Sequence, residues 1–160
     1  MELQKANAAK QINDQINKYI LFMDSKASIF LAGNVAAASF LLKGIPKDTL
    51  GMWLFGFAIT LHIVTIFFAG ASIFPRIPKH GNNVIFWGDI SSKPNAQSYK
   101  EQFDQVVNDG LLDDHYSELN YQAAKVMRRK CRYVRLTILF FFIALALSFA
   151  VYLRLPYEMK

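Results

Sequence analysis

The sequence predicts an all-helical integral membrane protein with three transmembrane helices and a small cytoplasmic helical head formed by extensions of the first and third spans. Three uncharged apolar stretches, in a chain of 160 residues that is 53% hydrophobic, carry this prediction. Glycine and proline are rare in and before the first and third stretches, so each can continue as a helix beyond the bilayer. Too little sequence remains for an independent soluble domain.

The second span is the most clearly bounded of the three. Leu50 to Phe74 contains no charged residue, and as a helix it would extend about 37 Å, against about 30 Å for the hydrocarbon core of a bilayer. Lys47 and Asp48 precede it, and a proline-rich cationic segment follows. We therefore expect a transmembrane helix over 50–74.

The first helix is expected from Glu2 to Leu42, with a cytoplasmic amphipathic stalk over 1–26 and the first span over 27–42. A row of apolar residues at helical spacing should pack the stalk on a partner; these are Ile12, Ile16, Tyr19, Ile20 and Met23. In the span, Gly33 with Ala37 and Ala32 with Ala36 would let another helix approach closely. We favour helix packing for Asn34 over a pore-lining position. The short loop with Gly44 and Pro46 predicts an antiparallel hairpin.

The polar region over 75–135 should contain helices near 95–108 and 111–135. The apolar run Val84 to Ile90 suits a strand, a short helix or a segment at the membrane surface. From Leu111 a second long helix is expected, whose soluble part has apolar residues in a four-three alternation, with one cation among them: Leu112, Tyr116, Leu119, Ala123, Val126, Lys130 and Tyr133. The third span follows over 136–153.

The distribution of Lys and Arg predicts the orientation. Fourteen of the eighteen lie on the side of the N-terminal stalk and the central region, so we expect the N-terminus in the cytoplasm and the C-terminus outside. The N-terminal residues are too polar for a signal peptide, so the first span should act as an uncleaved insertion signal.

Composition also narrows the function. The net charge of +6 is explained by lipid headgroups and topology rather than by a nucleic acid polymer. Cys131 is the only cysteine, and no cluster has metal-ligand spacing, so no cofactor or metal is expected. We predict no catalytic residues and no enzyme activity, because phosphate loops, paired carboxylates in apolar settings and nucleophile-base pairs are missing from the sequence.

Several polar residues near the membrane boundary have two interpretations. Asp24 and Lys26 suit a snorkelling anchor, or a polar cluster with Arg76 or the basic stretch of the third helix that senses a ligand or a change in packing. The basic run containing Arg129 and Arg132 suits the positive-inside signal, or an anion site whose arginines bind a nucleotide phosphate. Trp87, with Phe86 and Tyr99, would stack on a base or anchor at the interface.

His62 lies midway along the second span. We expect a packed or hydrogen-bonded histidine rather than a proton relay, because no acidic residue occurs in any span.

Four motifs resemble a known family, the transmembrane effectors of bacterial Pycsar anti-phage defence. They are FMDSKAS at the first span (22–28), FPRIP after the second (74–78), NVIFWGDI (83–90) and RKCRYVR before the third (129–135). The resemblance covers nearly the whole chain. It adds Asn83, the first residue of NVIFWGDI, to the candidates for ligand binding or signal coupling.

The resemblance implies an inner-membrane effector that is silent until a partner cyclase makes a cyclic pyrimidine nucleotide such as cUMP or cCMP. The activated effector then damages the lipid bilayer and stops the infected cell. The sequence has no recognisable soluble cyclic-nucleotide domain, so the nucleotide would bind the head or act indirectly. A homo-oligomer is expected from the amphipathic stalks and small-residue faces. The rival interpretations are a constitutive accessory or scaffold subunit that docks a partner protein, and a small enzyme or transporter.

Overall fold

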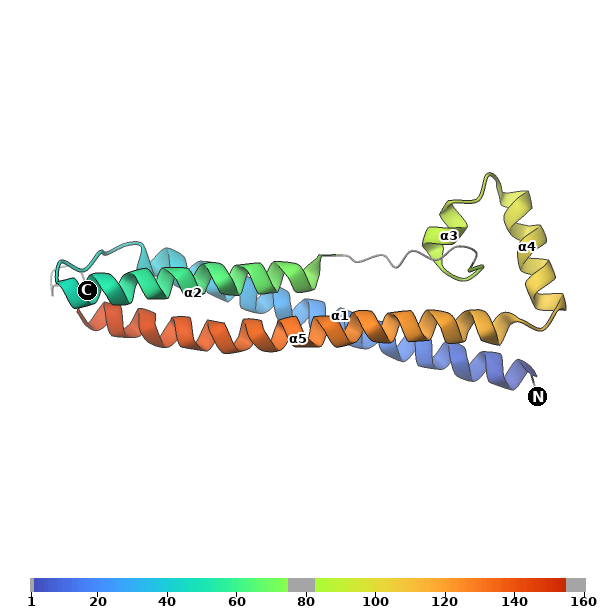
Figure 1. Cartoon of the computed structure of the whole chain (residues 1–160), viewed down its shortest axis with the longest axis horizontal. Helices are drawn as coiled ribbons and strands as arrows, with labels where there is room; N and C mark the ends of the chain where they lie inside the picture. The colour runs from blue at the N-terminus through green and yellow to red at the C-terminus, as the bar shows by residue number, and fades with distance from the viewer. Residues whose placement is uncertain (1, 75–82, 155–160) are drawn as a thin grey trace. The chain divides into compact units, whose positions relative to one another are not determined.

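A computed structural model describes residues 2–74 and 83–154 of the chain. The described residues form five α-helices and contain no strand: α1 (Glu2–Leu41), α2 (Thr49–Ile73), α3 (Trp87–Ser91), α4 (Ala96–Asn108) and α5 (Leu112–Leu153) (Figure 1). Three of them, α1, α2 and α5, are long and apolar enough to cross a membrane. The predicted fold class is therefore confirmed.

The chain divides into two compact units. One, which we call the head, contains residues 2–21 and 83–128, and the other, which we call the three-helix unit, contains residues 22–74 and 129–154. Because α1 and α5 are long, each contributes its residues to both units.

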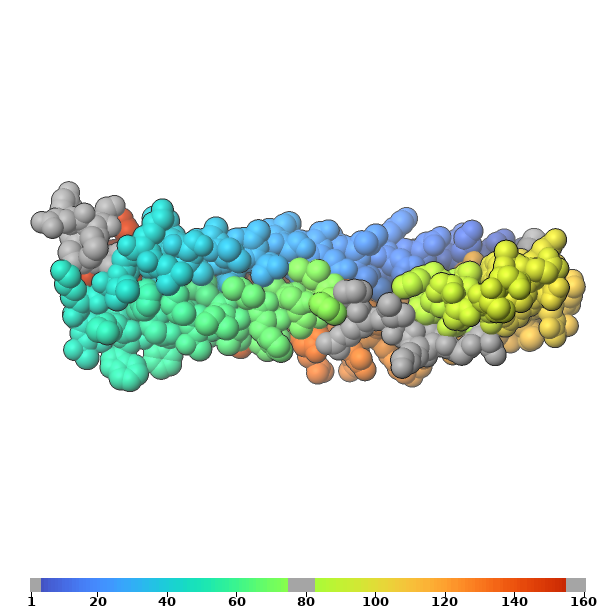
Figure 2. All heavy atoms as spheres, turned by 90° about the horizontal axis from the view of Figure 1, so that it is seen from above, coloured from blue at the N-terminus to red at the C-terminus, as the bar shows by residue number. Residues whose placement is uncertain are grey.

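In the three-helix unit, α1 and α2 form the predicted antiparallel hairpin, and α5 packs beside them (Figures 1 and 2). Buried positions recur every seven residues on each helix. They are Ala27, Asn34 and Leu41 on α1; Gly51, Ala58, Thr65 and Ser72 on α2; and Lys130, Thr137, Ala144 and Val151 on α5. This spacing is that of a coiled-coil seam, and it continues through the apolar part of each helix.

Most of these buried positions carry small or polar side chains, while large apolar side chains lie outside. Ile29, Phe57 and Phe149 are all more than 60% exposed. Lipid tails are as apolar as these side chains, so spans pack through small residues and interhelical hydrogen bonds. Gly33 follows this pattern, since a Cβ there would lie 3.7 Å from the ring of Phe141 on α5. Phe30 completes the contact, edge-on to Phe141 at 5.3 Å.

The start of α2 is built by a local cap. The Asp48 carboxylate accepts a hydrogen bond from the Gly51 N–H at 2.9 Å, and it also pairs with Arg154 at 2.9 Å. A Cβ on Gly51 would lie 2.5 Å from the Asp48 carboxylate and 2.6 Å from Pro46, so glycine is required at this close approach. The cap and the ion pair lower the pKa of Asp48 below its ordinary value, the Gly51 hydrogen bond contributing most.

In the head, α4 runs from Ala96 to Asn108. Asn95 caps its start by accepting a hydrogen bond from the Ser98 N–H at 2.8 Å. Gly110, with φ of 70°, ends it in the left-handed conformation that glycine adopts most readily. Asn120 on α5 donates to the carbonyl of Ala9 on α1 at 2.8 Å, which joins the two long helices within the head.

Within the chain, the packed face of the first stalk includes only part of the predicted row. Ile12 and Tyr19 are 51% and 55% exposed, whereas Asn13 is buried. Ile16 and Ile20, which the prediction included, are half-buried. The packed face follows the seven-residue spacing from Asn13 through Ile20 to Ala27, and this places Ile12 and Tyr19 outside it.

Candidate functional site

Two polar clusters, one in each unit, contain some of the residues that the sequence singles out. The first is centred on Asn83 in the head. Its side-chain oxygen accepts hydrogen bonds from the N–H groups of Ile85 and Phe86 at 2.9 and 3.2 Å, which makes an Asx turn. Its side-chain amide donates to the carbonyl of His115 at 2.9 Å, so the turn is tied to α5. Its own N–H donates to the Asp89 carboxylate at 2.8 Å.

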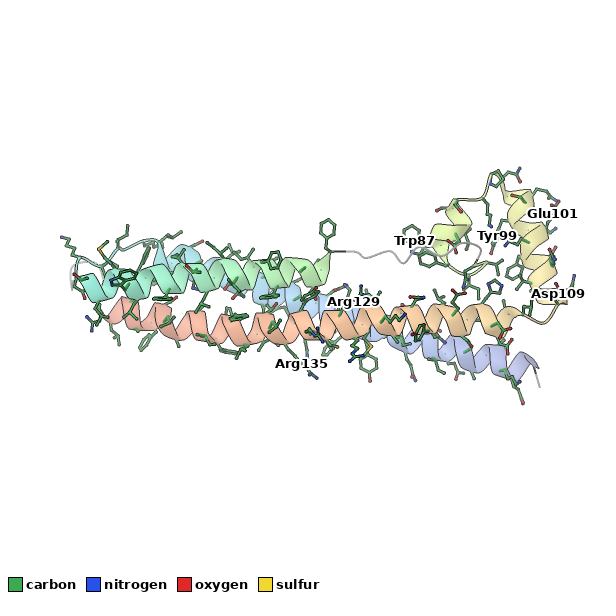
Figure 3. All side chains as sticks on the ribbon, in the orientation of Figure 1. Trp87, Tyr99, Glu101, Asp109, Arg129 and Arg135 are labelled. Atoms are coloured by element: carbon green, nitrogen blue, oxygen red, sulfur yellow. The ribbon has the colours of Figure 1, made fainter. Side chains whose placement is uncertain are left out.

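The segment after this turn includes the short helix α3 (Trp87–Ser91), so Val84 to Ile90 contains no strand; Val84 to Phe86 belong to the turn before the helix. The ring of Phe86 packs against Gly88, where a Cβ would lie 2.6 Å from the ring. Phe86 is therefore buried, and Tyr99 is used in donating to the carbonyl of Val84 at 3.3 Å. Trp87 alone of the three aromatic candidates is more than half exposed, at 61%, and Figure 3 labels it at the start of α3.

The second cluster lies in the three-helix unit and is centred on Lys130. Its ammonium group pairs with the Asp24 carboxylate on α1 and donates to the carbonyl of Ser72 at 2.7 Å. Its side chain is 8% exposed and that of Asp24 is 30% exposed. The Ser72 carbonyl belongs to the last turn of α2, where carbonyls lack helical partners and favour a cation. One lysine therefore joins all three helices.

The predicted partners of Asp24 are only partly right. Asp24 does meet the basic stretch of the third helix, but through Lys130 and not through Arg129 or Arg132, which are both exposed. Lys26 does not join this cluster, since its ammonium lies 4.2 Å from the centre of the Phe22 ring one turn earlier. Arg76 lies outside the described residues.

The exposed arginines of the basic stretch lie on more than one side of α5. Arg129 and Arg132 are exposed, as is Arg135, and Figure 3 shows Arg129 and Arg135 on different sides of the helix. Among the described residues no ion pair to these arginines is found. They are therefore accessible to an anion in solution or at a membrane surface.

A third polar contact joins the spans at mid-length. The Asn34 amide donates to the backbone carbonyl of His62 at 3.0 Å, which turns the Asn34 oxygen toward His62 Nδ1 at 2.7 Å. That nitrogen is therefore the donor, and Nε2 faces the Ser148 hydroxyl at 2.9 Å. The preferences for a hydrogen-bonded His62 and a packed Asn34 are both confirmed.

Sequence reasoning missed the central position of Lys130. The residue appears in the four-three alternation of α5 as its single cation, and that irregularity was the available signal. A lysine at a packing position is costly unless it is paired, so it predicts an acidic partner on the facing helix. The sequence offers Asp24 as an acid at the boundary of the first span, but it does not show which cation faces it.

Comparison with known proteins gives one family. Residues 8–155 match the family model described as the Pycsar effector protein domain. No curated protein and no solved structure was found to match the chain.

Proposed function

The chain belongs to the Pycsar effector family and is a membrane effector of anti-phage defence, and from this premise we propose that a cyclic pyrimidine nucleotide activates it to impair the inner membrane and abort infection. The family match over 8–155 is the observation that carries this proposal, because it spans both the head and the apolar helices. In this proposal a partner cyclase supplies cUMP or cCMP, and the effector acts on the bilayer rather than as an enzyme.

The proposed orientation places the head in the cytoplasm, where the cyclase product is made. The excess of Lys and Arg on the side of the head supports it, fourteen residues against four. Cysteine accessibility tests the orientation: Ser98→Cys in the head should be labelled by an impermeant maleimide only after the cells are opened, in a Cys131→Ser background.

For the nucleotide contacts we propose Trp87 as the stacking surface for the base. Its exposed ring suits this role, because stacking requires an accessible π-face. Arg129 and Arg132 belong to the three-helix unit and are a separate candidate site for an anion, since an exposed guanidinium binds phosphate in a bidentate manner. Each contact is tested separately below.

For signal coupling we propose that the nucleotide shifts α1 against α5 and separates Asp24 from Lys130. Support comes from the continuity of both helices through the head and the three-helix unit. A ligand that binds one arrangement of the helices better than the other shifts the population toward it. Self-association of several copies of the effector would complete the damage to the membrane. The exposed Ala32 and Ala36 on α1 leave room for a helix of another copy.

Dye release from liposomes that contain the purified full chain tests the proposal. We expect release with cUMP or cCMP and none with cAMP, which carries a purine. Trp87→Ala should raise the nucleotide concentration needed at least about fivefold, because base stacking contributes about 1–3 kcal/mol. Tyr121→Ala is the matched control, since Tyr121 is an equally exposed aromatic residue of the head.

The arginines are tested in the same assay. Arg129→Gln and Arg132→Gln should weaken the response more than Arg135→Gln, because Arg135 lies on a different side of α5 from Arg129 (Figure 3). Liposomes that stay intact with every nucleotide would contradict membrane damage as the output. Release without any nucleotide would contradict activation by a ligand.

A further inference from the structure

A groove of about 970 Å³ lies between α1 and α5, near the C-terminal ends of both helices. Small residues line it, among them Ala37, Gly44 and Ala146, together with three phenylalanines. The phenylalanines are 57–63% exposed and are Phe40, Phe142 and Phe149. The groove therefore belongs to the apolar part of the three-helix unit and is open to its surroundings.

One end of the groove is cationic. Lys43 lines it, with its ammonium 5.3 Å from the centre of the Phe40 ring. Asp48 is the only acidic residue described in this part of the three-helix unit, and its carboxylate is paired with Arg154 at 2.9 Å. Lys47 is exposed nearby in sequence. Among the described residues, no carboxylate forms an ion pair with Lys43.

We propose that this groove binds one anionic phospholipid, with an acyl chain between α1 and α5 and the phosphate on Lys43. The combination of an apolar channel with a cation at its polar end matches the two parts of such a lipid. A volume of about 970 Å³ is in the upper part of the range for small-molecule sites, about 300–1,000 Å³. The proposal needs only that the helices span a bilayer, and it is independent of nucleotide activation.

The walls favour a lipid over a helix from a second copy. Close packing of two helices in a membrane needs small residues that let the backbones approach, but the phenylalanines project on both sides of this groove. A flexible acyl chain fits between such rings. Its apolar contacts add little affinity, because the bilayer offers similar ones, so selectivity comes from the headgroup charge at Lys43.

The test measures lipid selectivity in phosphatidylcholine vesicles that contain the purified full chain. Electron paramagnetic resonance compares the immobilised fractions of chain-labelled phosphatidylglycerol and phosphatidylcholine. In the wild type we expect a preference for phosphatidylglycerol over phosphatidylcholine. At this site Lys43→Gln should lower that preference about fivefold, because one lysine near a membrane surface contributes roughly 1 kcal/mol. Lys47→Gln is the matched control, because it removes an equal charge that does not line the groove.

A second pair of variants changes the groove and keeps its charge. Ala146→Phe should fill the groove and lower the preference as Lys43→Gln does, whereas Val35→Phe, at an exposed position outside the lining, should not. Circular dichroism verifies that each variant keeps its helix content. An equal loss in Lys47→Gln, or no loss in Lys43→Gln, would overturn the proposal. So would a disulfide between two copies at Ala146→Cys in a Cys131→Ser background, which would place a second chain in the groove.

Discussion

The head and the three-helix unit bury different kinds of side chain. Among the buried apolar residues of the head are Val84, Phe86 and Val106, whereas those of the three-helix unit include four alanines: Ala27, Ala58, Ala69 and Ala144. In water, burial of large apolar side chains drives packing. In lipid that force is missing, and small residues with interhelical hydrogen bonds take over.

The same comparison applies to the polar contacts. In the head, Asn83 mainly completes the backbone hydrogen bonds of one turn. In the three-helix unit, Lys130 and His62 each join groups from three different helices. Loss of a polar residue should therefore have a local effect in the head and an effect on helix association in the three-helix unit.

The largest effect is expected for Lys130→Met. It leaves the Asp24 carboxylate and the Ser72 carbonyl without their cation, and we expect a loss of about 3 kcal/mol in the free energy of unfolding. This loss is at the low end of the usual range for breaking a buried ion pair, because Asp24 is 30% exposed. Titration with sodium dodecyl sulfate in mixed micelles, followed by circular dichroism, measures it. Arg129→Met, at the exposed neighbour, should change stability by less than about 0.5 kcal/mol.

Asn83→Ala should produce the next largest effect, about 2 kcal/mol of local stability in the head, since it leaves buried backbone donors unpaired. Hydrogen exchange of residues 83–91 measures it, and the amides of α2 should keep their protection. Asn95→Ala, which removes only the cap of α4, should cost about 1 kcal/mol and serves for comparison. Equal loss of protection in both units would contradict a local role.

Ser148→Ala should have a smaller effect on the three-helix unit. It removes one interhelical hydrogen bond to His62, and such bonds contribute about 0.6 kcal/mol in membrane proteins. The same detergent titration measures it. Thr60→Ala is the control, because the Thr60 hydroxyl bonds only within its own helix, to the carbonyl of Gly56. A loss above about 2 kcal/mol would mean that the spans depend on this bond far more than expected.

The smallest effect concerns pH at the start of α2. The pKa of Asp48 is lower in the folded chain than its ordinary value of 3.8, so its contribution is fully present above that pH and is lost as the pH falls through the folded pKa. Unfolding titrations of the wild type and of Asp48→Asn should differ near pH 6 and converge under strongly acidic conditions. A difference that grows on acidification would contradict this sign.

The helices were predictable because their determinants are local. The long uncharged stretches, the loop with Gly44 and Pro46, and Gly110 at the end of α4 specify where helices run and stop in any surroundings. The choice between strand and helix at Val84 to Ile90 was not local, since the turn before α3 is tied to other helices: Asn83 donates to the His115 carbonyl on α5, and Tyr99 on α4 donates to the Val84 carbonyl.

By itself the sequence determined the three spans, the long helices that extend two of them, and the family resemblance, because charge and apolar length act residue by residue. Only the tertiary structure decided which cation meets Asp24, and it selected Lys130 from a run of five basic residues. It also placed Asn13 rather than Ile12 on the packed face. Both outcomes depend on which side of one helix faces another, and a rotation of about 100° per residue makes neighbours in sequence face different surroundings.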